Sequence, residues 1–479
     1  MKGTHAERRY SPAAMQQALE AFRRQYPDYD ATAVLDELRA SDYARLDEQQ
    51  HTYLDYTGGG LYATSQLRQH LDLLSEGIFG NPHSTNPSSL ASTRLVESAR
   101  DYVLQFFNAS PQEYLVIFTP NASGALKLVG ESYPFGPGDT YLLTYDNHNS
   151  VNGIREFARG AGAEVTYVPL LPPDLRVDDA RLARELDAGR PGANNLFAFP
   201  AQSNFSGVQH PLAWVARAQA KGWDVLLDAA AFAPTNRLDL GAVKPDFVDL
   251  SFYKIFGYPT GIGCLIARRD TIGKLHRPWY AGGTIAFSSV QAQGFYRAPG
   301  PAGFEDGTVD YLGIPAVESG LRFIDAIGIE TIHRRVMALT GWLVEHLLAL
   351  RHSNGRPVIR LYGPATTRAR GATVEVNYYD PEGSLFDCNL VEEEANRRGI
   401  SLRAGCHCNP GAREVSIGLT EEEMAVCFRD ADRMTYEEFL HAIVGKTTGA
   451  VRASLGIASN FSDVYRYLEF AETFVDRRV

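Results

Sequence analysis

The chain has few cysteines for its length, and its composition gives no sign of a membrane or nucleic-acid protein. Its 479 residues include five cysteines, an odd number spread thinly, which does not make a disulfide framework. No apolar run approaches the length of a transmembrane helix, and the opening residues lack the apolar core of a secretory signal. A net charge of −11 argues against nucleic acid or an anionic membrane as partner, because phosphate binding needs clustered lysine and arginine. These absences indicate a reduced, cytoplasmic protein.

From about residue 114 the chain alternates short apolar runs, typical of strands, with helix-like stretches. Such alternation indicates an α/β fold with a mainly parallel sheet covered on both faces. The pattern after about residue 320 indicates a smaller α+β domain. The predicted parts are an N-terminal segment (1–60) that packs with the small domain, a large domain (61–320) and the small C-terminal domain (321–479). Seven runs predict the sheet: YLVIFT, TYLLTY, AEVTYVPL, NLFAFP, DVLLDAA, FVDLSFY and GCLIAR.

Two polar residues at strand ends could carry chemistry, since α/β sheets bind ligands beyond the carboxyl ends of their strands. Asp228 closes one apolar run, and Lys254 follows the next. A buried lysine can lose its proton and form a Schiff base with an aldehyde. An aspartate set against a pyridinium nitrogen keeps that ring protonated and makes it an electron sink. Taken singly, a strand-end aspartate more often caps a helix, and a lone lysine is more often solvated.

The segment FTPNASGALKLV places small residues between a strand and a helix. Backbone N–H groups and the Ser123 hydroxyl could bind a phosphate there, although an ordinary N-cap by Asn121 or Ser123 is the commoner outcome. Ser251 and Tyr253 could supply further donors to a phosphate. His148 offers an aromatic ring able to stack on a cofactor, but alone it is more often a surface or core histidine.

The segment SLRAGCHCNPGA leaves three alternatives open for Cys406, His407 and Cys408: half a metal site, a redox pair, or a loop with one nucleophilic thiol. The spacing lacks the usual Cys-x-x-Cys of zinc sites, and no second cluster completes four ligands. A disulfide between two cysteines this close would be strained. Cys388 and Cys427 lie in apolar surroundings typical of buried core cysteines.

Together these residues resemble the class V aminotransferase family of pyridoxal-phosphate enzymes, especially the cysteine desulfurases. The sequence is most similar to the pyridoxal-phosphate domain of molybdenum cofactor sulfurases, with motifs in the expected order from residue 53 to about 457. The resemblance implies fold type I of the pyridoxal-phosphate-dependent transferases, with pyridoxal 5′-phosphate as cofactor. The matching motifs are YLDYTGGGLY, NPHSTNPSS, DNHNSVNGIR, QSNFSG, LLDAAA, SFYKIFGYPTGIG, FEDGT, LRAGCHCNPGA and TGAVRASLG.

The resemblance implies a role for each cofactor residue. Lys254 would bind the cofactor as a Schiff base and later move the proton of the substrate Cα. Asp228 would pair with the ring nitrogen, His148 would stack on the ring, and Asn204 would contact the ring hydroxyl. Thr308 would reach the phosphate of the neighbouring subunit's cofactor, which implies a homodimer with shared active sites. The remaining cofactor-binding residues are Ala122, Ser123, Ser251 and Tyr253.

The resemblance also assigns the substrate side. Arg403 and Arg452 fall where the family holds the substrate carboxylate, for which a guanidinium fork is suited. Arg403, Gly405 and Cys408 match the family's Arg-x-Gly-x-x-Cys pattern, which favours Cys408 over Cys406 as nucleophile. The arginines and His407 are expected to favour its thiolate. The implied reaction removes sulfur from L-cysteine, giving alanine and a Cys408 persulfide for a sulfur acceptor, without a protein-bound metal.

Three departures from the family keep other functions open. Arg413 replaces a further loop cysteine, and Ala231 stands where simpler desulfurases have glutamine. The short stretch after VRASLGIAS also gives the expectation that the acceptor domain of these sulfurases is missing. One alternative is a pyridoxal-phosphate-dependent carbon–sulfur lyase, an aminotransferase-like enzyme or another amino-acid-modifying enzyme of a biosynthetic pathway. A second is a sulfur carrier that binds a partner without turnover.

Overall fold

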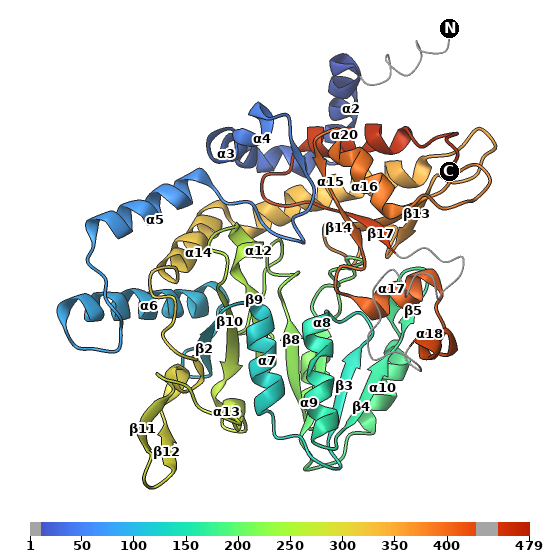
Figure 1. Ribbon diagram of the computed structural model, residues 1–479. Coiled ribbons are helices and arrows are strands. Elements are labelled where there is room, and N and C mark those ends of the chain that lie inside the picture. The colour runs from blue at the N-terminus through green and yellow to red at the C-terminus, as the bar shows by residue number, and fades with distance from the viewer. Residues whose placement is uncertain (1–10, 428–448) are drawn as a thin grey trace.

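The computed structural model describes residues 11–427 and 449–479, and its centre is a seven-stranded sheet (Figure 1). Five neighbouring strands run parallel, and β10 is antiparallel to both of its neighbours. The predicted α/β fold with a mainly parallel seven-stranded sheet is therefore confirmed. In sheet order the strands are β2 (Tyr114–Thr119), β10 (Gly263–Arg268), β9 (Phe247–Ser251), β8 (Trp223–Asp228), β7 (Asn195–Pro200), β3 (Thr140–Thr144) and β4 (Glu164–Val168).

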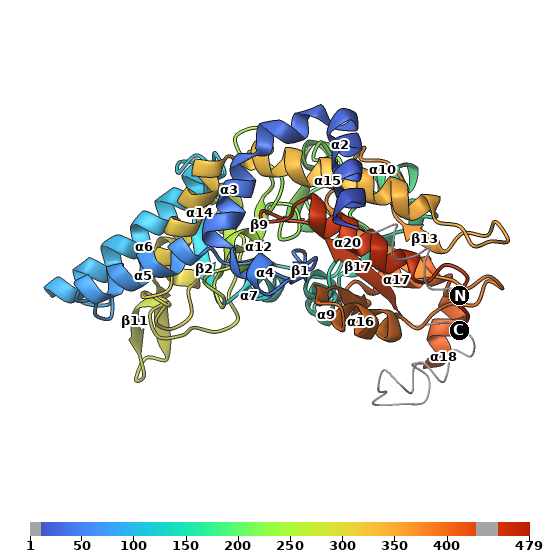
Figure 2. The same ribbon diagram turned by 90° about the horizontal axis from the view of Figure 1, so that it is seen from above.

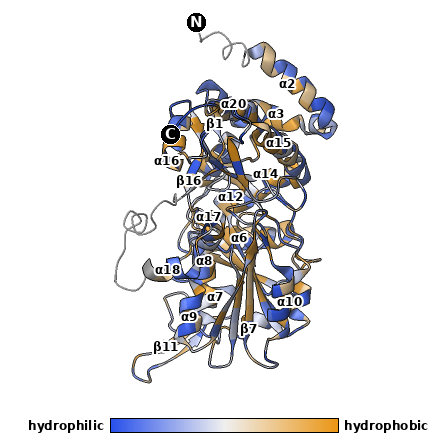
Figure 3. Ribbon diagram, turned by 90° about the vertical axis from the view of Figure 1, so that its right-hand side faces the viewer, coloured by the Kyte–Doolittle hydropathy of each residue, from blue (hydrophilic) through white to orange (hydrophobic). Residues whose placement is uncertain are grey.

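Both faces of this sheet are apolar because helices cover both. Along β3, Leu142 packs into one hydrophobic cluster, while Tyr141 and Leu143 pack into the other, as expected for side chains that alternate between the faces of a strand. Figure 3 shows the sheet edge-on, with α7 and α9 on one side and α10 on the other. The covering helices include α6 (Pro87–Phe106), α7 (Ala122–Ser132), α9 (Ile154–Gly160), α10 (Asp179–Asp187), α11 (Trp214–Gln219) and α14 (Pro315–Ile327).

A second, antiparallel sheet of four strands lies beyond the carboxyl ends of the parallel strands (Figure 1). Its edge strand β16 is only three residues long and leads directly into the segment with Cys406 and Cys408. In sheet order the strands are β13 (Ile359–Tyr362), β14 (Thr373–Tyr378), β17 (Ala450–Ser454) and β16 (Arg403–Gly405), and its helices include α15 (Ile329–Ala349), α16 (Cys388–Asn396) and α20 (Phe461–Glu472).

The N-terminal segment packs on this second layer, with α2 (Pro12–Gln25) beside α20 and the turn η1 (Pro27–Thr32) beside α15 (Figure 2). The α2 helix ends just before Pro27, because proline disfavours helical backbone at the residue before it. Next in the chain, α3 (Val34–Asp42) carries Arg39, whose buried guanidinium donates to the carboxylate of Asp463 at 2.6 Å. The domain bounds at residues 60 and 320 stay a prediction. Within the described ranges, no helix has both the length and the hydropathy needed to cross a bilayer.

The buried Arg39–Asp463 pair gives a stability prediction. Replacing Arg39 with methionine leaves the Asp463 carboxylate buried without its cation, so we expect the free energy of unfolding to fall by about 3 kcal/mol. The matched control is Arg23→Met, because Arg23 pairs with Asp30 at 3.0 Å on the surface and should contribute less than about 0.5 kcal/mol. The measurement is the midpoint of chemical denaturation for both variants. Equal midpoints would contradict the role given to the buried pair.

Candidate active site

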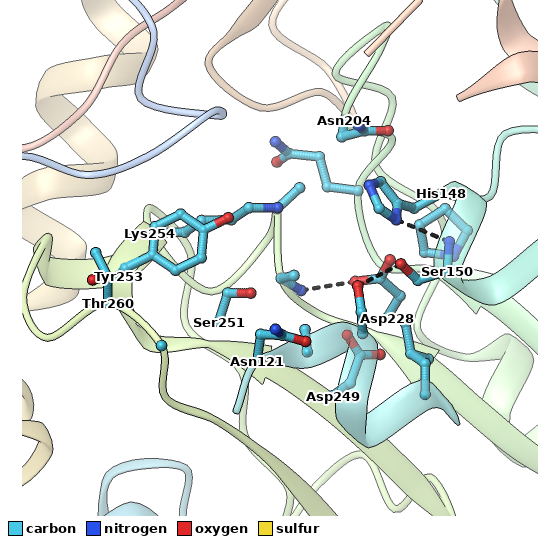
Figure 4. Close-up of a pocket in the computed structure, with 18 residues that line it drawn as sticks. Asn121, His148, Ser150, Asn204, Asp228, Asp249, Ser251, Tyr253, Lys254 and Thr260 are labelled. Carbon is cyan, nitrogen blue, oxygen red and sulfur yellow. Dashed lines mark hydrogen bonds between the residues drawn. The ribbon is translucent and has the colours of Figure 1, made fainter. Parts of the chain in front are cut away.

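A cavity of about 360 Å³ lies at the carboxyl ends of β7, β8 and β9 (Figure 4). The parallel strands all end at this edge of the sheet, so residues far apart in sequence meet there. Gln202, Asp249 and Ser150 also line the cavity, although nothing in the sequence analysis singled them out. The cavity brings together eight of the nine predicted cofactor residues: Ala122, Ser123, His148, Asn204, Asp228, Ser251, Tyr253 and Lys254.

Lys254 projects into the cavity from α12 (Phe252–Phe256), the short helix that follows β9. Burial lowers the pKa of its amine, the charge of Asp228 acts in the opposite direction, and the charge of Arg452 lowers the pKa further. In the described part of the chain no group accepts a hydrogen bond from Lys254 Nζ. A desolvated amine with a lowered pKa is the form that attacks an aldehyde.

Asp228 ends β8, and its Oδ1 accepts a hydrogen bond from the backbone of Ala230 at 2.9 Å. Its partner in register on β9 is Asp249, a fully buried residue that sequence reasoning missed. The available signal was the single acidic residue inside the apolar run FVDLSFY. Two carboxyls therefore lie on the cavity side of neighbouring strands, where one was predicted.

The N-terminus of α7 forms another wall of the cavity. Asn121 caps the helix, with its Oδ1 accepting from the Gly124 N–H at 2.8 Å, so the ordinary N-cap is present. Ser123 Oγ lies 2.6 Å from Ser150 Oγ. Among the described residues, none accepts a hydrogen bond from the N–H of Ala122 or Ser123. An uncapped pair of N–H groups beside two hydroxyls at a helix N-terminus suits a phosphate.

His148 forms the N-cap of α8 (Asn149–Asn152), and its Nδ1 accepts a hydrogen bond from the Ser150 N–H at 3.1 Å. Burial lowers the pKa of His148, and the neighbouring Lys254 lowers it further. The imidazole is therefore neutral near pH 7, as a ring that stacks on an aromatic cofactor should be. The lining thus fits pyridoxal phosphate: an unpartnered amine for the aldehyde, a carboxylate for the ring nitrogen and free N–H groups for the phosphate.

The two predicted substrate arginines meet on Asp55, which sequence reasoning did not single out. Arg403 donates to both oxygens of Asp55, at 2.6 to 3.1 Å, and Arg452 donates to Oδ1 at 3.1 Å. A Cβ on Gly58 would lie 2.5 Å from Asp55 and 2.6 Å from Arg403, so a side chain there would displace these groups. The three groups carry one net positive charge, which suits a substrate carboxylate.

The loop with the two cysteines is attached to the cavity rim by hydrogen bonds. Asn204 donates to the carbonyl of His407 at 2.7 Å and accepts from the side chain of Asn409 at 2.9 Å. The carbonyl of Cys408 accepts from the N–H of Asn149 at 2.7 Å. His407 and Cys408 have φ of 54° and 55°, a left-handed backbone that non-glycine residues adopt at a cost. These bonds hold the loop in that strained conformation, with Cys408 exposed and Cys406 half-buried.

The predicted electrostatic role of His407 is wrong. His407 is buried, and its Nε2 lies 2.9 Å from Oε1 of the buried Glu375. Burial and the charge of Arg452 hold the pKa of His407 well below its usual value, while burial raises that of Glu375 well above the ordinary range. Both shifts favour the neutral forms of the two groups. His407 anchors the loop and adds no positive charge beside Cys408.

Cys388 and Thr308 do not line this cavity. Cys388 is buried as predicted, whereas the side chain of Cys427 lies outside the described residues. Over the described ranges no cluster of three or more metal-ligating side chains is found. Thr308 lines a neighbouring cavity of about 520 Å³, and its hydroxyl accepts from Asn81 at 3.3 Å. Its role toward a second subunit stays a prediction.

Comparison with solved structures defines the fold class. A cysteine desulfurase of Thermococcus onnurineus superposes with a TM-score of 0.75 at 23% identity, covering 92% of this chain and 98% of that one. A cysteine desulfurase of Escherichia coli gives a TM-score of 0.72 at 21% identity, covering 92% of this chain and 98% of its own. The fold is therefore type I of the pyridoxal-phosphate-dependent transferases, as predicted.

Sequence comparison identifies the family. The aminotransferase class-V model matches residues 52–467, so the chain belongs to the class-V aminotransferase family, and the predicted pyridoxal phosphate is the cofactor of that family. Molybdenum cofactor sulfurases of Solanum lycopersicum and Homo sapiens are 36% and 35% identical over 96% and 91% of this chain. The chain spans 59% and 51% of those relatives' lengths.

The environment of Lys254 predicts an unusual pH dependence in the cofactor-free protein. Its amine should react with formaldehyde and borohydride at a pH below the ordinary lysine pKa of about 10.4, since only the neutral amine reacts. Asp228→Asn should lower the midpoint further, because the Asp228 charge raises the pKa of Lys254. Peptide mass spectrometry over a pH series measures both, with exposed Lys127 as internal reference. A midpoint that rises in the variant would contradict this electrostatic account.

Proposed function

We propose that the chain removes sulfur from L-cysteine, leaving alanine and a persulfide on Cys408. The observation that carries the proposal is the hydrogen-bonded attachment of the Cys408 loop to the rim of the Lys254 cavity. Asn204 donates to the carbonyl of His407 at 2.7 Å, and the carbonyl of Cys408 accepts from the N–H of Asn149 at 2.7 Å. A nucleophilic thiol beside an amine that can bind an aldehyde is the pair that such chemistry needs.

Each part of the site has one task in this proposal. Pyridoxal phosphate, when bound, supplies the aromatic ring that withdraws electrons from the substrate Cα. Arg403 and Arg452 bind the substrate carboxylate, and Lys254 accepts the Cα proton and returns a proton to the product. The Cys408 thiolate attacks the substrate sulfur, so the sulfur–sulfur bond forms as the bond from Cβ to sulfur breaks. Cysteine and the thiol thus become alanine and a persulfide, without an added oxidant.

The proposal includes a sulfur acceptor, a second subunit and a compartment. An acceptor would remove the outer sulfur of the Cys408 persulfide, as the similarity to molybdenum cofactor sulfurases suggests. A homodimer would bring Thr308 to the partner's cofactor. A reducing, cytoplasmic compartment would keep the thiols free, and the four cysteines with described side chains are all free thiols.

The nucleophile is tested with two single variants. Cofactor-loaded protein is incubated with L-cysteine, and the mass of the peptide that contains both loop cysteines is measured by mass spectrometry. The unmodified protein and Cys406→Ala should gain the mass of one sulfur, whereas Cys408→Ala should not. Alanine formation by Cys408→Ala should also fall about a hundredfold or more. Unchanged alanine formation in that variant would contradict the persulfide role, and pyruvate in place of alanine would favour a carbon–sulfur lyase.

The proposed contact with the substrate carboxylate is tested at Arg403. This side chain is half-exposed, so we expect its replacement to have little effect on folding. Arg403→Met removes a charge-assisted bidentate donor, so KM for cysteine should rise about tenfold or more. Arg397→Met serves as the matched control, because Arg397 pairs with Glu393 on the surface at 3.2 Å. Steady-state kinetics of both variants give the answer. A KM for Arg403→Met equal to that of the control would remove Arg403 from the substrate site.

A further inference from the structure

Asp249 is a buried acid at the cavity that the proposed function does not use. It lies on β9 in register with Asp228 on β8, and the two strands are parallel. Residues in register on neighbouring parallel strands project from the same face, with backbones about 5 Å apart. Both side chains line the cavity, and Asp249 is 0% exposed (Figure 4). The structure therefore places a second carboxyl beside Asp228, the residue that would pair with the ring nitrogen of the cofactor.

The hydrogen-bonding partners of these carboxyls are unequal. Asp228 Oδ1 accepts from the Ala230 N–H at 2.9 Å, whereas no N–H or hydroxyl group in the described ranges donates to either oxygen of Asp249. A buried carboxylate without a donor is costly, and two adjacent carboxylates cannot both stay ionised. A proton on Asp249 removes both difficulties, because the neutral carboxyl then donates to Asp228. Accordingly, burial raises the pKa of Asp249 well above its ordinary range, and Asp228 raises it further.

Two other ionisable groups near Asp249 carry no charge that could pair with its carboxyl. Tyr141 on β3 and Cys264 on β10 are buried and neutral, since burial raises the pKa of both well above their usual values. The charge of Lys254 on α12 lowers the pKa of Asp249, and its effect is smaller than that of Asp228. Among these groups, the Asp228 carboxylate therefore acts most strongly on Asp249.

We propose that Asp249 is a positioning residue that acts through Asp228: its protonated carboxyl donates a hydrogen bond to the Asp228 carboxylate, so the pair shares one proton and one negative charge. This bond fixes the rotation of Asp228 toward the cavity. It also leaves a single negative charge to oppose the Lys254 amine or the ring nitrogen of the cofactor. Only this last consequence rests on the proposed function, because the shared proton is a property of the chain's own residues.

The first test detects the proton directly. Infrared difference spectra at neutral pH compare the unmodified protein with Asp249→Asn, each with and without bound pyridoxal phosphate. The carbonyl stretch of a protonated carboxylic acid should be present in the unmodified protein and lost in the variant. Glu375→Gln is the matched control, since it removes a different buried acid and should leave the Asp249 band in place. An Asp249→Asn variant that loses no acid carbonyl band would overturn the proposal.

The second test uses pH and a pair of variants. Because the folded-state pKa of Asp249 is raised, its contribution to stability is full below the unfolded pKa of about 3.9 and is lost as pH rises. The thermal midpoint of Asp249→Asn minus that of the unmodified protein should therefore increase with pH above that value. A difference that stays constant with pH would mean that Asp249 holds no such proton.

Cofactor affinity completes the test. Asp249→Asn keeps a donor to Asp228 and should hold the dissociation constant of pyridoxal phosphate within about threefold, whereas Asp249→Leu should raise it about tenfold or more. Equal losses of affinity in both variants would show a merely structural role. If Asp249→Leu does not fold, the infrared band and the pH dependence of the thermal midpoint of Asp249→Asn still test whether Asp249 holds the proton. None of these readouts involves sulfur transfer, so failure of the proposed function would leave them unchanged.

Discussion

The side-chain amide of Asn204 joins the two halves of the site, and the arrangement of the remaining residues depends on it. Asn204 follows β7 of the large sheet. Its side-chain amide donates to the carbonyl of His407 and accepts from the side chain of Asn409, and its backbone carbonyl accepts from Arg452 at 2.9 Å. One residue therefore contacts both the cysteine loop and Arg452, one of the two arginines proposed to bind the substrate. The second N–H of its amide is left for the predicted contact with the ring hydroxyl of the cofactor.

The charged groups around Asn204 largely offset one another. Asp55 offsets one of the two arginines, and Asp228 faces the Lys254 amine across the cavity. The neutral His407 and Glu375 hold the loop without adding a charge, because burial disfavours the ionised form of each. A persulfide on Cys408 would carry a negative charge near Arg403 and Arg452. This charge balance supports the proposal that the site binds an amino-acid carboxylate and then stabilises a persulfide on the loop.

The sequence predicts the sheet and most of the cavity because both follow from local patterns. Apolar runs mark the strands, and ligand-binding residues gather at the carboxyl ends of parallel strands, which is how Asp228 and Lys254 could be found together. Asp55, Asn409 and Glu375 could not be found this way, since the partners described above lie between 32 and 397 residues away. The error at His407 has the same origin, because a histidine beside two thiols shows nothing of its burial against Glu375.

Rapid-quench measurement of the first turnover tests the central claim most directly, namely that Cys408 takes its sulfur from a cysteine bound at the Lys254 cavity. Cofactor-loaded protein is mixed with L-cysteine in the absence of an acceptor. The amounts of alanine and pyruvate formed are then expressed per mole of active sites. The account predicts a burst that approaches one alanine per chain, followed by slow turnover limited by removal of sulfur from the loop. Pyruvate as the product, or alanine formed without a burst, would contradict it.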